Sequence, residues 1–182
     1  MTTPKTWKGV IKHLSTMPQE VQDYFEHFPR LAKEFPWEVS LSYLFGRVEL
    51  AHNMVIYCGA VKLHGADSAL ARTAIENHHM TRDGFKKLFE TIHGKQIPHA
   101  ISKKIEESES VRDKVMHGKS ATQNEQRQAI ADVLDYARDF NEFVYNLSGL
   151  RPFDDLRGFK GRKQSLDKAT SRWLLKGMGF NL

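Results

Sequence analysis

The chain has 182 residues, of which 40% are hydrophobic and 27% are charged, a composition typical of a folded globular domain and not of a disordered chain. Its single cysteine, Cys58, excludes an intrachain disulfide and any zinc site that needs two cysteines. No run of about 18 apolar residues is present to cross a membrane, and the first residues lack the apolar stretch of a signal peptide. One thiol suits a reducing compartment, and we therefore expect a cytoplasmic protein without a membrane partner.

The net charge of +5 is concentrated near the C-terminus. Residues 151–182 hold eight Lys and Arg against three Asp, whereas residues 1–150 hold equal numbers of basic and acidic residues. We therefore expect a helical bundle over 1–149 and a basic, partly helical tail over 150–182. Such a tail attracts phosphate backbones through counterion release; the alternative is a solvated tail without a partner.

The first third of the chain shows helical signals around three prolines. Thr16 and Gln19 have the spacing of a capping box, which predicts a helix from there to about Phe28. Pro29 and Pro36 then bound a short piece, and a long helix is predicted from about Trp37 to His64.

The helix predicted over 37–64 is apolar on two faces. One face holds Leu41, Leu44, Val48, Ala51, Val55 and Cys58, and the other holds Tyr43, Leu50, Met54, Tyr57 and Val61. Such a helix lies either in the centre of a bundle or against a partner subunit. We favour the centre of the bundle, with dimer contact as the alternative.

The rest of the chain predicts further helices. Two short ones are expected over 68–79 and 82–93, the second ended by Gly94. A third begins at Pro98 and ends at His117–Gly118, and the capping box Thr122–Glu125 begins a long helix to about Leu147. With a final helix over about 165–176, the chain is predicted to be an all-α domain of five to seven helices, built on two long scaffold helices.

One short motif lies where a predicted helix ends and the capped helix follows. The motif consists of Arg112 and His117, with four residues between them, and Asp113 directly follows the arginine. It resembles the Arg-x4–6-His motif of the HEPN superfamily of small all-α domains. The resemblance in architecture covers about 36–148, and the motif covers 112–117. Spacings that fit this motif also occur elsewhere in the chain, between Arg47 and His52 and between Arg72 and His78 or His79. What distinguishes Arg112 and His117 is their position at the end of a helix.

These residue types suit RNA cleavage, because histidine can act as acid or base near neutral pH and arginine offers a fixed charge to phosphate oxygens. The resemblance implies a metal-independent endoribonuclease without a cofactor, which yields a 2′,3′-cyclic phosphate and a 5′-hydroxyl. It also implies a homodimer whose two motifs, each with Arg112, His117 and a supporting Asp113, line one cleft. Proteins of this family often act as toxins or in phage defence, so an antitoxin partner is plausible.

Basic residues around the motif and in the tail are the candidates for RNA contact: Lys114, Lys119, Arg157, Lys160, Arg162 and Lys163. The main alternative is a catalytically inactive HEPN-like module that binds nucleic acid or protein. A third possibility is a helical transcription regulator with residues 151–176 on DNA, although no helix-turn-helix is evident there. If Arg112 and His117 face a shared basic cleft, catalysis is favoured, and if they face bulk solvent on opposite sides, the binding module is favoured.

Overall fold

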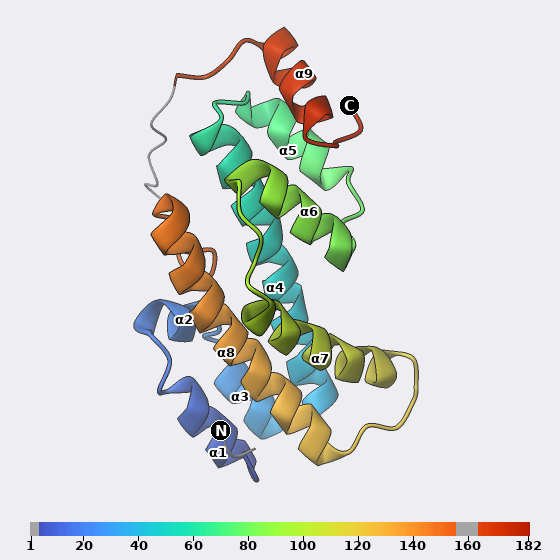
Figure 1. Ribbon diagram of the computed structural model, residues 1–182. Helices are drawn as coiled ribbons and strands as arrows, with labels where there is room; N and C mark the ends of the chain where they lie inside the picture. The colour runs from blue at the N-terminus through green and yellow to red at the C-terminus, as the bar shows by residue number, and fades with distance from the viewer. Residues whose placement is uncertain (1–3, 156–163) are drawn as a thin grey trace. The chain divides into compact units, whose positions relative to one another are not determined.

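The computed structural model describes residues 4–155 and 164–182. Within these ranges the chain forms nine α-helices and one π-helical segment, with no strand (Figure 1). The all-α prediction is confirmed, but five to seven helices was too few, because the first 35 residues fold as three short helices. None of the described helices is both long and apolar enough to cross a membrane. The predicted RNA contacts Arg157, Lys160, Arg162 and Lys163 lie outside the described residues.

The described residues form two compact units. Unit 1 consists of 4–49, 98–143 and 153–155, and unit 2 consists of 50–97, 144–152 and 164–182. The two longest helices, α4 (Trp37–Cys58) and α8 (Gln123–Ser148), contribute residues to both.

Three short helices open unit 1: α1 (Trp7–Leu14), α2 (Gln19–Tyr24) and α3 (Phe28–Glu34). Helix α1 was not predicted from the sequence. Its N-cap Thr6 accepts a hydrogen bond from the backbone N–H of Gly9. The capping box predicted at Thr16 is wrong. Its hydroxyl instead donates to the carbonyl of His13 at 2.7 Å, and Pro18 begins α2 without a side-chain cap.

The core of unit 1 is an aromatic cluster on which helices from both halves of the chain pack. The cluster consists of Phe25, Tyr136, Phe140 and Phe153, each at most 1% exposed. Neighbouring rings in it contact one another at centroid distances of 5.3–6.4 Å. Asn141 holds the backbone of Phe153 with two hydrogen bonds, donating to its carbonyl and accepting from its N–H. Buried polar groups satisfied in this way fix one arrangement of the core.

The connection between α7 (His99–Met116) and α8 follows the prediction. Beyond Met116 the chain leaves the helix at His117 and reverses at Gly118, whose φ is +68°. The hydroxyl of Thr122 accepts from the N–H of Glu125, and the Glu125 carboxylate accepts from the N–H of Thr122. This reciprocal capping box begins α8 where the sequence predicts it.

The two apolar faces of α4 have different environments. All six residues of the first face are buried, as predicted. On the second face, by contrast, Leu50 is 45% exposed and Met54 and Tyr57 are only half-buried. The preferred prediction, a central helix covered on both faces, is therefore wrong for this part of the second face, because Leu50, Met54 and Tyr57 line an open cavity described below.

Unit 2 contains the second half of α4, a π-helical segment η1 (Gly59–Leu63), α5 (Ser68–Glu76), α6 (Arg82–His93) and α9 (Lys168–Gly177). Helix α6 matches its predicted bounds, and α5 ends three residues before its predicted end. In Figure 1, α9 lies alongside α5, and the N–H of Asp67 donates to the hydroxyl of Ser171 at 2.8 Å.

Candidate functional site

Arg112 lies near the C-terminal end of α7 and faces α4 within unit 1. Its side chain is 29% exposed, and one guanidinium nitrogen donates to the Asp113 carboxylate at 2.9 Å. A second nitrogen lies 3.6 Å from the Glu49 carboxylate, and the guanidinium lies 5.5 Å from the centre of the Phe45 ring. Two carboxylates and an aromatic ring therefore hold Arg112 in place and offset its charge.

His117 occupies the C-cap position of α7, at the start of the turn to α8. The residue is exposed, and its ring makes no hydrogen bond or ion pair with any residue in the described part of the chain. Both ring nitrogens are therefore accessible to a ligand.

One chain by itself does not place Arg112 and His117 on the same face of α7. The helix continues to Met116, and five helical positions correspond to a rotation of roughly 140°. Arg112 shares its side of the helix with the buried Ile105 and Ser108, whereas His117 is exposed. A site that uses both side chains on one phosphate therefore needs a second chain or a rearrangement of the turn.

The two lysines predicted beside the motif have different surroundings. Lys114 lies 3.4 Å from the Glu125 carboxylate. Hydrogen bonds from the backbone and the hydroxyl of Thr122 lower the pKa of Glu125, and Lys114 lowers it further. Lys119 is exposed and makes no ion pair with a described residue. Lys119 is therefore the better placed of the two to contact a phosphate.

An acidic cavity of about 230 Å³, not predicted from the sequence, lies between α7 and α8 in unit 1. Glu107, Glu125 and Asp132 supply its carboxylates, with Ser108 and Gln128 among the other lining residues. Burial raises the pKa of Asp132, and the neighbouring carboxylates add to that shift. The negative charge on this side of α7 opposes the approach of a polyanion.

The alternative match, Arg47 and His52, consists of structural residues. The Arg47 guanidinium donates two hydrogen bonds to the carbonyl of Tyr24. The His52 ring stacks on Phe85 at a centroid distance of 3.8 Å, and desolvation lowers its pKa to about 3. The structure therefore removes this pair as a competing site.

The outer face of α9 is basic and carries an exposed indole. Lys168, Arg172 and Lys176 follow one another at every fourth position, and all three are exposed. Trp173, beside this row, is 77% exposed. Cations beside an open aromatic ring are typical of surfaces that bind single-stranded nucleic acid. The positive charge of the tail predicts a surface that binds nucleic acid. That the Trp173 indole lies on this surface is seen only in the structure of α9.

The described residues contain no group of three or more His, Cys, Asp or Glu side chains arranged to hold a metal ion. No family model, curated protein or solved structure matches this chain. The resemblance to the HEPN superfamily therefore rests on residues 112–117 and on their position between two helices.

Proposed function

We propose that this protein is a metal-independent endoribonuclease of HEPN type, in which His117 transfers protons and Arg112 binds the phosphate. The observation that carries the proposal is the placement of His117: exposed, without a partner among the described residues, and at the helix end that follows Arg112. Asp113, 2.9 Å from Arg112, acts as a positioning residue for the guanidinium.

The proposed active unit is a homodimer. Since Arg112 and His117 point roughly 140° apart on one helix, two chains together would supply two histidines and two arginines to one cleft. One histidine takes the proton of the 2′-hydroxyl, whose oxygen attacks the phosphorus. The bond from phosphorus to the 5′-oxygen breaks, and the second histidine gives that oxygen a proton. The products are a 2′,3′-cyclic phosphate and a 5′-hydroxyl.

RNA binding is assigned to Lys119 and to the basic face of α9. Bases would stack on Trp173 while Arg172 and Lys176 contact phosphates. A toxin or phage-defence role in the cytoplasm, with an antitoxin as partner, remains part of the proposal through the HEPN resemblance.

A second candidate is a HEPN-like module that binds nucleic acid or protein without cleaving RNA. The surroundings of Arg112 favour this candidate, because the carboxylates of Glu49 and Asp113 already offset the positive charge with which Arg112 would bind a phosphate. Glu49→Gln tests whether Arg112 contacts RNA. If it does, removing the Glu49 charge should tighten RNA binding, and an unchanged affinity would show that Arg112 does not bind the phosphate. Cleavage, measured below, separates the two candidates.

The direct test incubates total RNA with the protein in EDTA and maps the new termini. Wild type should cleave and leave cyclic phosphates, whereas His117→Ala and Arg112→Ala should not. His99→Ala is the matched control, because His99 is an exposed histidine at the other end of α7. Equal cleavage by wild type and His117→Ala would remove His117 from the mechanism. If wild type does not cleave RNA, the inactive binding module becomes the favoured function.

Light scattering of the same preparations tests the dimer. A mass of two chains is expected for wild type and for both active-site variants. A strict monomer at high protein concentration would contradict the composite site.

A further inference from the structure

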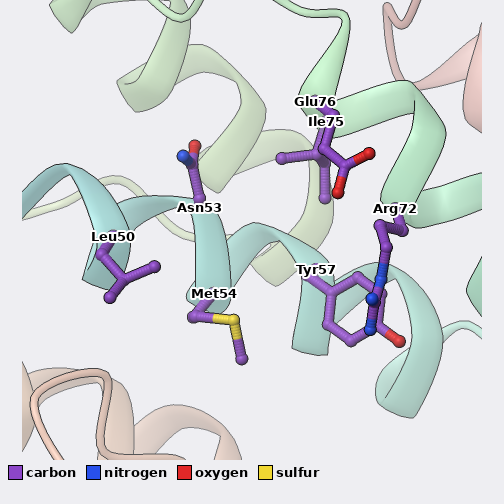
Figure 2. Close-up of a pocket in the computed structure, with 7 residues that line it drawn as sticks. All are labelled: Leu50, Asn53, Met54, Tyr57, Arg72, Ile75 and Glu76. Carbon is purple, nitrogen blue, oxygen red and sulfur yellow. The ribbon is translucent and has the colours of Figure 1, made fainter.

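Unit 2 contains an open cavity of about 280 Å³ between α4 and α5 (Figure 2). Its lining residues are Leu50, Asn53, Met54, Tyr57, Arg72, Ile75 and Glu76. The volume is close to the lower end of the roughly 300–1,000 Å³ typical of small-molecule sites. A partner protein would instead cover about 800 Å² of surface, so the size of the cavity favours a small ligand.

The cavity has an apolar floor that the fold leaves uncovered. Residues 50, 53, 54 and 57 are spaced to form one face of α4, and residues 72, 75 and 76 form one face of α5. Leu50, Met54 and Ile75 supply apolar surface from both helices. Burial of this surface by a ligand is favourable.

Four polar side chains surround this floor: Asn53, Tyr57, Arg72 and Glu76. None of them makes a side-chain hydrogen bond or an ion pair with any residue in 4–155 or 164–182. Arg72 and Glu76 are one turn apart on α5, a spacing at which opposite charges often pair, and yet they form no ion pair here. The cavity therefore presents one unused positive and one unused negative charge beside apolar surface.

We propose that this cavity binds a small zwitterion with an apolar body, such as an amino acid with an apolar side chain. Arg72 binds the carboxylate and Glu76 binds the ammonium group, because each supplies the complementary charge. Tyr57 and Asn53 offer further hydrogen bonds to the polar end, and the apolar body lies against Leu50, Met54 and Ile75. The site uses neither Arg112 nor His117 and does not depend on the proposed ribonuclease activity.

Three related probes test the assignment on the full chain: L-phenylalanine, 3-phenylpropionate, which lacks the ammonium group, and 2-phenylethylamine, which lacks the carboxylate. Titration calorimetry gives the affinities, and the side-chain amide signal of Asn53 in NMR spectra reports on the cavity. L-phenylalanine should bind best, with each incomplete probe weaker by about tenfold or more, since each lacks one hydrogen-bonded charge.

Two variants at exposed positions assign the charges, and neither alters the core. Arg72→Ala should weaken L-phenylalanine and 3-phenylpropionate but leave 2-phenylethylamine unchanged. Glu76→Gln should weaken L-phenylalanine and 2-phenylethylamine but leave 3-phenylpropionate unchanged. Arg82→Ala, an exposed arginine on α6, should change none of the three affinities.

The proposal is overturned if no probe binds at millimolar concentration. It is also overturned if all three bind equally, which would indicate a merely apolar patch. An unchanged order of affinities in both Arg72→Ala and Glu76→Gln would likewise contradict the assigned roles.

Discussion

Arg47 and Tyr24 each hold the backbone of the other. The Arg47 guanidinium donates to the carbonyl of Tyr24 at 3.2 and 2.9 Å, and the Tyr24 hydroxyl donates to the carbonyl of Arg47 at 2.9 Å. The guanidinium also lies 3.9 Å from the centre of the Tyr24 ring. Burial, partly offset by Arg47, raises the pKa of Tyr24 to about 12, so its hydroxyl stays protonated and donates at all physiological pH values. The pair joins α2 to α4 in unit 1.

Arg47→Ala should therefore lower the free energy of unfolding by about 2–4 kcal/mol, because two charge-assisted hydrogen bonds and a cation–π contact are lost. Arg47→Lys should recover less than half of this, since lysine lacks the planar fork. Urea denaturation measures the change. Arg30→Ala, which removes an exposed ion pair with Glu34, should cost no more than about 0.5 kcal/mol; equal losses would contradict a structural role for Arg47.

Gly59 makes a close approach that glycine alone permits. A Cβ at this position would overlap the Cγ2 atom of Ile92 and lie 3.0 Å from Nε2 of His93. Gly59→Ala should therefore destabilise the protein by about 1–3 kcal/mol through overpacking.

Gly46 is the control for Gly59, because it lies within α4, the helix that directly precedes Gly59, and a Cβ there would contact nothing within 4 Å. Gly46→Ala should stabilise the protein by about 0.5–1 kcal/mol through helix propensity. The midpoints of thermal denaturation of the two variants should shift in opposite directions. A loss of stability in Gly46→Ala would contradict the expectation that a Cβ is accommodated there.

His93 is expected to make stability depend on pH. Desolvation lowers its pKa from 6.5 to about 4, so the folded protein favours the neutral ring and the unfolded chain binds the proton more readily. The contribution is fully present above pH 6.5 and is lost as the pH falls towards 4, amounting to about 3 kcal/mol at about 1.4 kcal/mol per pKa unit.

The variant His93→Gln keeps a donor for the carbonyl of Val55, which lies 3.4 Å from Nε2 of His93, but does not titrate. Denaturation between pH 7 and pH 4 should show a shallower loss of stability than in wild type. His99→Gln, at an exposed position, should follow wild type. Parallel curves for His93→Gln and wild type would contradict the assignment.

Trp173 is predicted to carry single-stranded RNA binding on α9. Trp173→Ala should weaken binding of a short RNA by about 1–3 kcal/mol, the usual contribution of base stacking, and Trp173→Phe should recover part of it. Replacing Lys168, Arg172 and Lys176 together with Ala should reduce the slope of log affinity against log salt concentration by about 2, at roughly 0.7 for each of the three charges. Trp7→Ala, at a 37% exposed tryptophan of α1, is the control. An unchanged affinity in Trp173→Ala would exclude base stacking on Trp173, and an unchanged salt dependence in the triple variant would remove α9 from the interface.

The sequence by itself determined those features that depend on neighbouring residues. Helix α6 and the turn from α7 to α8 follow from Gly94, Gly118 and the Thr122–Glu125 capping box, all of which act within one or two turns. The placement of Arg112 and His117 at the end of a helix was predictable for the same reason.

Tertiary structure alone decided which of those side chains are open to a ligand. The Glu49 carboxylate that holds Arg112 comes from another helix, far away in the sequence. Likewise, the periodicity of α4 marks Leu50 and Met54 as apolar but does not reveal that they line a cavity beside Arg72. Helical periodicity records only the pattern within one segment, whereas burial, charge pairing and cavities depend on which segments pack together.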